Sequence, residues 1–424
     1  MFQMSLPVIA FLALILMIVF AMTMPINIGA TSLGMALVVG HYIGGQKVAD
    51  ILKSYPTSLF IAMVGITYFF TMAQVNGTLD KIIKYTLKSV KGNTAILPII
   101  FFFVAFFLAA IGPGQNASFV MAPIVMLLAE EAGIHPMLIA IATSNGVQAG
   151  ALSPIALAGI IVAGITQKMG LTGVGGILWL NQAVGHFLTA ILAYIIFGGL
   201  KLWKVKDAGQ RQALANIQVE PFTRNQLITL IAIIVFIIGV AFFKLDVGLG
   251  GFLFGTILAM FRIADEGKAL KQMPWGIILF VTGVMVLVEL MSKIGGMELF
   301  ASIIARLSTP LTITLVAGFI AGAISAYAGT TGFVLPAFMP LAPVLLQKVG
   351  APATDLIPLL STIVVCGFLV DFSPLSATGA IFYANAGERT DKQKLFRQMI
   401  TWGLSMAVVG SILCWLFFTV LRLP

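Results

Sequence analysis

The sequence contains very little charge. Asp, Glu, Lys and Arg make up 9% of the 424 residues, whereas a soluble domain holds about 25%. Apolar residues reach 60%, against about 45–50% in a soluble domain. A chain of this composition cannot cover a water-facing surface with polar groups. It excludes an ordinary soluble protein and predicts a polytopic protein embedded in a lipid bilayer.

Cysteine and histidine are also scarce. There are two cysteines, Cys366 and Cys414, both within apolar runs, and three histidines that are far apart in the sequence. Neither set has the spacing of a metal site. The sequence also lacks the HExxH, GxSxG and Walker patterns of common hydrolases and nucleotide-binding proteins. We therefore expect no metal, no bound cofactor and no enzymatic activity.

The positive charges indicate a position relative to the membrane. The formal net charge is +9, which in a soluble protein would suggest nucleic acid. In a membrane protein the same excess is typical of cytoplasmic loops that face anionic lipid, so no nucleic-acid partner is expected. Lys47 is the first basic residue, and a secretory signal would need one earlier. The opening segment is therefore interpreted as a retained span of a bacterial-type inner membrane protein.

Apolar runs of about 20 residues, the length needed to cross a bilayer, divide the chain into two similar halves. The first half covers residues 1–200, a cytoplasmic linker covers 201–224, and the second half covers 225–424. The spans predicted in the first half are 6–24, 27–45, 57–75, 137–165 and 176–200. Those predicted in the second half are 225–243, 249–263, 275–292, 354–386 and 397–421. Two amphipathic stretches, 78–91 and 293–307, suit helices that lie in the membrane interface.

Each half also contains a segment that is interrupted by Gly and Pro. We predict re-entrant hairpins at 94–132, with its tip at 112–118, and at 309–349, with its tip near 329–334. The longest span of each half is predicted to be a broken helix, interrupted by 144–154 in the first and around 367–376 in the second. Irregular backbone at membrane depth survives only where protein or a water-filled cavity satisfies its polar groups.

The two halves align at a constant offset of 220 residues. This offset pairs Gly112 with Gly332, Ser153-Pro154 with Ser373-Pro374, and Gly159 with Gly379. Five spans in each half would make the second half upside down relative to the first. The fold class predicted is therefore an all-α membrane protein with two inverted-topology repeats of five spans and one hairpin each. Matching broken segments in such repeats point to the binding site of a transporter.

The distribution of Lys and Arg tests the sidedness. With both termini outside, 16 of the 24 Lys and Arg residues lie on the cytoplasmic side, as the positive-inside rule requires. If the hairpins were full spans, the halves would instead be parallel. The charge distribution does not separate these two topologies, so the choice of hairpins depends on the short second arm and the Gly/Pro tip.

Small polar residues gather at the tips and breaks. Hydroxyl and amide groups, together with the free N–H groups of half-helix N-termini, can hold a small anion without a Lys or Arg. Each residue alone could equally bond to its own helix or join two helices. As a set, the predicted substrate-binding residues are Gly114, Gln115, Asn116, Ser118, Ser144, Asn145, Gln148, Thr330, Thr331, Ser373, Ser376 and Thr378.

Asp371 is the single acidic residue of the two breaks, and its counterpart in the first half is Ala151. A carboxylate at membrane depth is costly and usually functional. Asp371 could be a Na⁺ ligand, a proton carrier or an acceptor for unwound N–H groups. Thr143, Ser153 and Asp371 are predicted to couple transport to Na⁺ or H⁺. Glu289 is better explained by an interfacial pair with Lys293, four residues later, than by a functional role.

These motifs resemble the malonate/dicarboxylate carrier family of the ion transporter superfamily, which is related to divalent-anion/sodium symporters. The resemblance rests on Gly112-Pro113-Gly114 with Ala122-Pro123, on Gly150–Pro154, on Thr330-Thr331-Gly332, and on Asp371–Ser376 with Gly379-Ala380. The Ser-Asn-Thr triplet typical of the divalent-anion branch is replaced at the first tip by Gly112-Pro113-Gly114. The resemblance implies a homodimer with a fixed scaffold domain and a mobile transport domain, working by an elevator mechanism.

The function expected is secondary active transport of a small dicarboxylate, coupled to Na⁺ or H⁺. A transporter of another small anion, such as a monocarboxylate, sulfate or an arsenic oxyanion, remains a rival. An anion channel is a second rival, because it would need no coupling acid. A membrane-embedded enzyme is disfavoured by the absence of paired catalytic groups.

Overall fold

The protein is described from a computed structural model that covers residues 5–24, 26–88, 95–203 and 220–423. Most of the predicted linker (204–219), the last residues of the first interfacial stretch (89–91) and the start of the first hairpin (94) lie outside the described residues. The described chain folds into helices and turns without a strand. Within it, six helices are long and apolar enough to cross a membrane. The protein is an integral membrane protein.

The described part of the first half contains eleven helices and, among its irregular segments, a π-helical segment and a 3-10 turn. Its helices are α1 (Leu6–Thr23), α2 (Ile28–Met35), α3 (Val48–Lys53), α4 (Thr57–Val75), α5 (Thr78–Lys88), α6 (Leu97–Ala110), α7 (Ala117–Glu131), α8 (Pro136–Gly150), α9 (Leu157–Lys168), α10 (Gly175–Ile196) and α11 (Gly199–Leu202). Helix α2 continues as the π-helical segment Ala36–Ile43. The short 3-10 turn Gly114–Asn116 joins α6 to α7.

The second half repeats this order of elements. Its helices are α13 (Arg224–Phe243), α14 (Val247–Met260), α15 (Glu266–Gln272), α16 (Trp275–Lys293), α17 (Gly296–Arg306), α18 (Ile313–Ala328), α19 (Leu335–Phe338), α20 (Ala342–Val349), α21 (Leu356–Val370), α22 (Ala377–Ala384) and α23 (Lys392–Cys414). A π-helical turn, Thr330–Val334, joins α18 to α19. The chain then passes through the 3-10 turn Met339–Leu341 into α20, and α23 continues as Trp415–Val420.

Polar side chains fix where several of these helices begin. Thr223 and Gln226 form a reciprocal capping box at the start of α13. Asp246, Asp265 and Asp391 each accept a hydrogen bond from a first-turn N–H group of α14, α15 and α23. Each cap satisfies a donor that has no partner inside the helix. The caps lie between apolar runs, so they mark where a connecting turn ends and the next helix begins.

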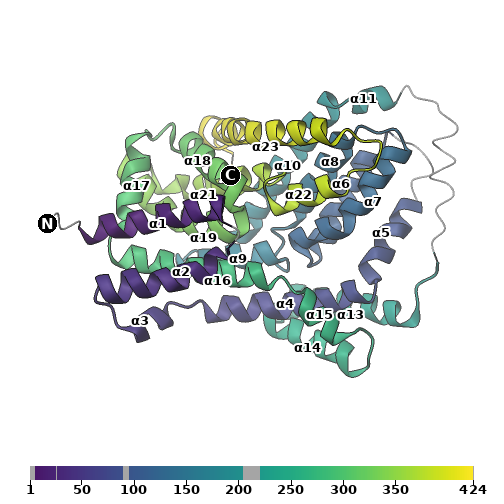
Figure 1. Ribbon diagram of the computed structural model, residues 1–424, viewed down its shortest axis with the longest axis horizontal. Helices are drawn as coiled ribbons and strands as arrows, with labels where there is room; N and C mark the ends of the chain where they lie inside the picture. Colours follow the sequence, from purple (N-terminus) through teal and green to yellow (C-terminus); the bar gives the residue numbers. More distant parts are fainter. Residues whose placement is uncertain (1–4, 25, 89–94, 204–219, 424) are drawn as a thin grey trace.

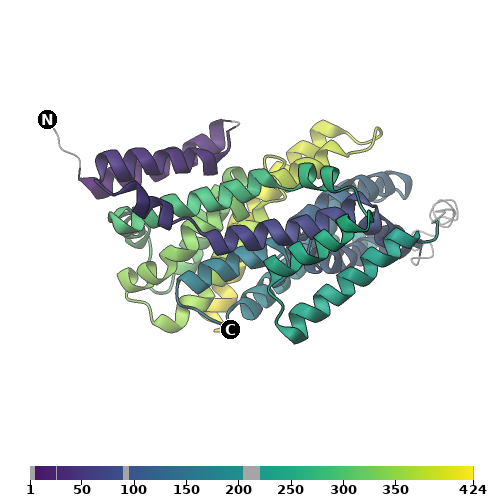
Figure 2. The same ribbon diagram turned by 90° about the horizontal axis from the view of Figure 1, so that it is seen from below.

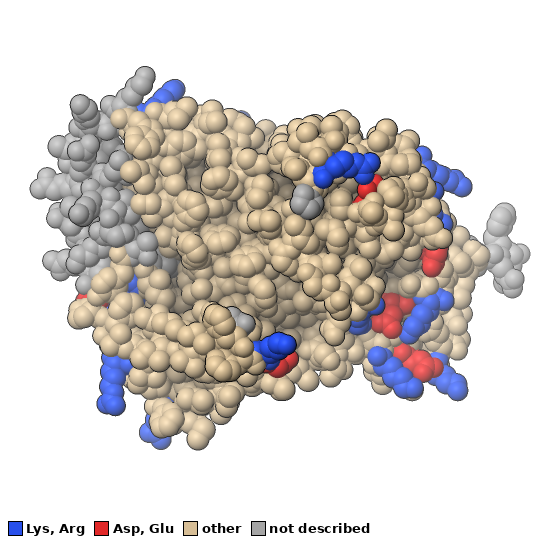
Figure 3. All heavy atoms as spheres, turned by 180° about the vertical axis from the view of Figure 1, so that it is seen from behind, with Lys and Arg blue, Asp and Glu red and all other residues tan. Residues whose placement is uncertain are grey.

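Most long helices run along the long axis of the molecule (Figure 1). Helices α3 and α17 lie at one end of this axis, and α5 and α11 lie at the other. Viewed from below, the first helices (purple) lie along the upper edge near the N-terminus, and α13 with α14 (teal) lie along the lower edge toward the other end of the molecule (Figure 2). Charged residues on the face of Figure 3 gather mainly near the ends and leave wide uncharged areas between them.

The halves interlock through two close helix crossings. A Cβ atom added to Gly65 of α4 would lie 1.9 Å from the carbonyl oxygen of Gly248 in α14. A Cβ atom added to Gly283 of α16 would lie 2.1 Å from the carbonyl oxygen of Gly29 in α2. Only glycine allows such backbone contact. Each half therefore supplies a long helix that crosses a short helix of the other half in the same manner.

The predicted spans agree with the helices to within a few residues, but both breaks were placed too early. Helix α8 continues to Gly150 and the break is 151–156, not 144–154. Helix α21 continues to Val370 and its break is 371–376. Thr143, Ser144, Asn145 and Gln148 therefore lie in a helix, contrary to the prediction. The short helices α3 and α15 were not predicted.

Candidate functional site

The two breaks have the same main-chain geometry. The N–H of Gly159 donates to the carbonyl of Ala151 at 3.2 Å, and the N–H of Gly379 donates to that of Asp371 at the same distance. The turns begin alike, because Ser153 donates to Gly150 at 3.0 Å and Ser373 donates to Val370 at 2.8 Å. These hydrogen bonds satisfy main-chain groups that a helix would otherwise leave without partners in an apolar environment.

Glycine is required where each second half-helix begins. A Cβ atom at Gly159 would lie 1.9 Å from the carbonyl oxygen of Ser153, and one at Gly379 would lie 2.0 Å from that of Ser373. The Ser-Pro pair turns the chain back so that this carbonyl faces the new helix. The same sharp turn occurs in both halves, and it explains why a Ser-Pro pair is followed six residues after the serine by a glycine in each half.

The hairpin tips are also built on glycine. Gly112 and Gly114 have φ values of 144° and 57°, and Gly329 at the second tip has a φ of 77°. Gly112 packs against the Phe70 ring of α4, and Gly332 packs against the Phe280 ring of α16. Each tip is thus seated on a long helix outside its own hairpin, and each tip needs a backbone conformation that suits glycine.

The two tips meet through Gln115. The Thr331 hydroxyl donates to Gln115 Oε1 at 2.7 Å. Gln115 Nε2 in turn donates to Gln148 Oε1 at 3.1 Å and to Asp371 Oδ2 at 3.2 Å. One amide therefore connects both hairpins and both broken helices. These four residues form the centre of the candidate site.

Asp371 is buried at the end of α21, and 4% of its surface is exposed. Its Oδ1 accepts from Ser325 at 3.0 Å, and Ser325 also bonds to the Thr330 hydroxyl at 2.6 Å. Within the described part of the chain, no Lys or Arg forms an ion pair with it. Its carboxylate is therefore held by neutral donors alone.

Several other predicted residues support the breaks and do not enter the centre. Ser153 donates to the carbonyl of Ala110 in α6, which holds the first hairpin against its broken helix. Ser376 accepts from Gly379 N at 3.2 Å and donates to the carbonyl of Asp371, so it caps α22. Ser373 accepts a long 3.4 Å bond from Leu375 N.

The remaining predicted residues fall into four groups. Asn145 accepts bonds from His186 and Thr189 of α10 and so lies away from the tips. Ser118 and Thr143 are buried, and their hydroxyls have no partner among the described residues. Gly114 and Asn116 lie at the first tip, with Gly114 close to Leu157 N at the start of α9. Ser144 and Thr378 are buried near the breaks.

Some contributing residues were not predicted. Ser325 contacts Asp371 directly, and the signal for it was a polar residue in an apolar arm five positions before Thr330. On α10, Gln182, His186 and Thr189 face α8. Their spacing of four and three residues follows one face of a helix. This polar stripe could have been read from the sequence.

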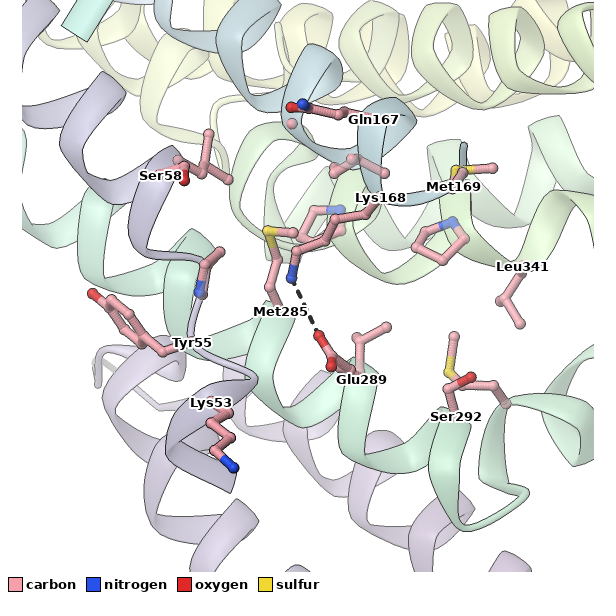
Figure 4. Close-up of a pocket in the computed structure, with 18 of the residues that line it drawn as sticks. Lys53, Tyr55, Ser58, Gln167, Lys168, Met169, Met285, Glu289, Ser292 and Leu341 are labelled. Atoms are coloured by element: carbon pink, nitrogen blue, oxygen red, sulfur yellow. Dashed lines mark hydrogen bonds and ion pairs between the residues drawn. The ribbon is translucent and has the colours of Figure 1, made fainter. Parts of the chain in front are cut away.

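The largest cavity described lies apart from this centre, with a volume of about 800 Å³. Its walls come from the start of α4, the end of α9, α16, α17 and the second arm of the second hairpin. Lys168 of α9 reaches across to Glu289 of α16 at 3.2 Å (Figure 4). Glu289 also contacts Lys293 at 3.3 Å. The interfacial pair predicted for Glu289 is present, with a second lysine added.

Solved transporters share this fold. MtrF of Neisseria gonorrhoeae, described with a class of antimetabolite efflux pumps, aligns over 100% of this chain and 96% of its own, with a TM-score of 0.62 and 12% identity. The YdaH transporter of Alcanivorax borkumensis aligns over 89% of this chain and 88% of its own, with a TM-score of 0.58 and 16% identity. At such identities the likeness shows the fold alone.

A family of carrier proteins matches the N-terminal part of the chain, which indicates a transporter and not an enzyme. Residues 4–151 match the family described as "Dicarboxylate carrier protein MatC N-terminus". The match confirms the resemblance to a malonate/dicarboxylate carrier family. No curated protein matches the sequence. Placement in the wider superfamily stays a prediction.

Proposed function

We propose that the protein is a secondary active transporter of a small dicarboxylate, coupled to Na⁺ or H⁺. The dicarboxylate carrier match supports the substrate class. The observation that carries the proposal is the position of Asp371, buried where both hairpins and both broken helices meet, without a basic partner. A site of neutral donors around one acidic residue can bind an anion together with a cation.

The surroundings of Asp371 argue for a coupling cation. An ionised carboxylate in an apolar interior is costly unless an opposite charge balances it. Ser325 and Gln115 each donate one hydrogen bond, but neutral donors do not cancel the charge. A proton on Asp371, or Na⁺ beside it, would do so. The coupling ion would thus bind at Asp371, with Ser153 and Thr143 as further candidates from the first half.

The dicarboxylate would bind between the tips and the starts of the half-helices. The first N–H groups of α9 and α22 have no partners inside their helices and carry a partial positive charge suited to a carboxylate. Gly114 lies beside Leu157 N at the start of α9. Asn116 and Thr331 add side-chain donors at the two tips. One carboxylate facing each break would explain why the site is built twice.

The motion we propose is an elevator movement between inverted repeats, in a homodimer with both termini outside. In this scheme the hairpins, α8–α9, α21–α22, α10 and α23 would move as one body. The long helices α4 and α16 and the short helices α14 and α2 that they cross would form the scaffold, interlocked at Gly65 and Gly283. The cavity of about 800 Å³ lies between elements of the two groups, which is where sliding would require space.

Two alternatives remain beside the main proposal. Another small anion, such as a monocarboxylate, sulfate or an arsenic oxyanion, would use the same amides, hydroxyls and helix ends. An anion channel would need no acid at the centre, and the buried Asp371 argues against it.

The long second arm of the second hairpin, Thr330–Val349, is itself long enough to cross a membrane. Labelling of single cysteines from either side of the membrane would test whether this arm is re-entrant.

Uptake into liposomes tests the proposal. Purified protein would be reconstituted and supplied with radiolabelled malonate, succinate, acetate, sulfate or arsenate, with a Na⁺ gradient, a pH gradient or neither. We expect accumulation of a dicarboxylate under one of the two gradients. Accumulation of only another anion would favour the first alternative. Flux that equilibrates without coupling under both gradients would favour a channel.

A further inference from the structure

Helix α10 carries a stripe of polar side chains that faces α8. Trp179 Nε1 donates to the carbonyl of Ala149 at 2.9 Å, and Gln182 Nε2 donates to that of Gln148 at 3.4 Å. One turn further along α10, His186 Nδ1 lies 2.5 Å from Asn145 Oδ1. We call the surface between α8 and α10 that carries these contacts the polar seam.

Three atoms of the polar seam are buried without a partner in the part of the chain that the structure describes. They are Gln148 Nε2, Gln182 Oε1 and His186 Nε2. Gln182 and His186 are completely buried, and Gln148 is 1% exposed. An unsatisfied buried polar atom costs about 1–3 kcal/mol. Three such atoms on two helices that bond to each other therefore indicate a small polar ligand that completes their hydrogen bonds.

The chemistry of the three atoms specifies the ligand. The carbonyl oxygen of Asn145 can only accept, so the proton of His186 is on Nδ1, and Nε2 of the neutral ring is an acceptor. Gln182 Oε1 is a second acceptor, and Gln148 Nε2 is a donor. A water molecule donates twice and accepts, which matches this set. A metal cation does not match, because Gln148 Nε2 would point a donor at it.

We propose that the polar seam holds one internal water molecule between Gln148, Gln182 and His186. Gln182 and His186 are then positioning residues for the candidate site. The water holds the amide of Gln148 in the orientation that turns Oε1 toward Gln115. Gln115 in turn donates to Asp371 and accepts from Thr331. The orientation of four residues at the centre is thereby fixed from α10.

The second half provides an internal comparison. At the offset of 220, the residues of α21 that correspond to Asn145 and Gln148 are Val365 and Phe368, and both are buried. The buried face of α23 consists mainly of apolar residues, among them Met399, Trp402 and Met406. Apolar side chains therefore suffice to pack this pair of helices. The polar side chains of α10 are not needed for packing, and a role toward Gln148 accounts for them.

The first experiment examines the water directly. A structure of the purified wild-type protein at a resolution that reveals ordered waters should contain a density peak within hydrogen-bond distance of all three atoms. Direct pairing of Gln148 Nε2 with Gln182 Oε1, or an empty layer, would overturn the proposal. This measurement requires no knowledge of the substrate and no variant that must fold.

The second experiment is a double-mutant cycle on thermal stability in detergent. Gln182→Leu removes one acceptor, and His186→Asn keeps a donor toward Asn145 while it removes Nε2. If both residues bond the same water, each substitution alone lowers the melting temperature. In the double variant the combined loss should then be clearly smaller than the sum of the two single losses, because either substitution already releases the water. Asn181→Leu is the control on the same helix, because its amide donates to Ser361 of α21 and shares no partner with either residue, and it should be additive with both. Additive losses for Gln182→Leu and His186→Asn would contradict a shared water.

The third experiment measures transport and depends on the proposed function. Gln182→Leu should raise the half-saturation concentration for the dicarboxylate or the coupling ion about fivefold, the effect of one lost hydrogen bond, with little change in maximal rate. An unchanged half-saturation concentration would remove the positioning role. If the wild-type protein transports no dicarboxylate, the proposed function is wrong, but the proposed water is not affected by that result. The density peak and the double-mutant cycle then still decide whether the water is present.

Discussion

Thr331 donates a hydrogen bond of 2.7 Å to Gln115, although 216 positions separate the two residues in the chain. This contact joins the tip of one hairpin to the tip of the other. It brings the neutral amide of Gln115 over the buried carboxylate of Asp371 at 3.2 Å. A change that separates the hairpins must break this contact, so access to Asp371 and contact between the tips are linked.

Asp371→Asn should abolish coupled transport and leave folding intact. Asparagine can still accept from Ser325 through its carbonyl oxygen, but its NH2 group replaces the oxygen that accepts from Gln115, so one hydrogen bond is lost. The negative charge that attracts the cation is lost with it. We expect gradient-driven uptake to fall about tenfold or more, the equivalent of about 1.4 kcal/mol. Asp50→Asn is the control, because Asp50 forms only an exposed pair with Lys53. Normal coupled uptake by the Asp371 variant would assign the residue a structural role.

Gly159→Ala and Gly379→Ala should be equally harmful. In both, the new methyl group would lie about 2 Å from a carbonyl oxygen of the turn, and backbone cannot yield as a side chain can. Overpacking of this kind costs about 1–3 kcal/mol or more. Gly175→Ala is the control, because nothing lies within 4 Å of its added Cβ. Melting temperature and the yield of monodisperse protein report the outcome. A variant at either position as stable as the control would contradict the shared turn.

Glu289→Gln should destabilise the protein more than Lys168→Gln does. Glu289 lies between Lys168 and Lys293, so its loss leaves two lysines without a counter-charge, whereas loss of Lys168 leaves the pair with Lys293. These side chains are 36–45% exposed, and we expect differences below about 1 kcal/mol. High salt should reduce the difference further. Melting curves at two salt concentrations would show it, and the opposite ranking would refute the argument.

His135 should make stability depend on pH. It caps α8, since its Nδ1 accepts from Met137 N at 3.2 Å. Burial, and secondly the charge of Lys394, lower the pKa of His135 below its ordinary 6.5. The unfolded chain therefore binds a proton first, and stability should decline as pH falls below about 6.5 until the folded pKa is reached.

His135→Asn is the variant that tests this dependence. Asparagine is a good N-cap and does not titrate, so α8 keeps its cap. The melting temperature of the variant should decline less between pH 7 and pH 5.5 than that of the wild-type protein. Equal declines in the two proteins would show that another group causes the dependence.

Much of the architecture could be predicted because composition and repetition are strong signals in a membrane protein. The span 57–75 coincides with α4, and the Ser-Pro pairs mark both breaks. The limits of the breaks could not be predicted from polarity. Asn145 stays helical because α10 supplies partners for its side chain, and the side-chain oxygen of Gln148 accepts from Gln115 at the hairpin tip. Polar side chains do not end a helix when a neighbouring helix satisfies them.

The site shows a similar division between what the sequence reveals and what it conceals. The offset of 220 located Gln115, Thr331 and Asp371, since each lies at a tip or a break. It could not reveal that Gln115 is the residue that touches the other two, because that depends on how the hairpins approach each other. Ser325 was missed for the same reason. It precedes the tip by more than one helical turn and reaches Asp371 only in the folded protein.

The central claim, that the hairpin tips around Asp371 bind the transported dicarboxylate, is tested most directly by protection of a cysteine at the tip. Cys366 and Cys414 would be replaced by alanine, and Asn116→Cys introduced, in protein that still transports. We expect dicarboxylate to protect this cysteine from a small thiol reagent, with a concentration dependence that follows its half-saturation for uptake. A labelling rate that is unchanged at saturating dicarboxylate, while uptake continues, would show that substrate binds elsewhere.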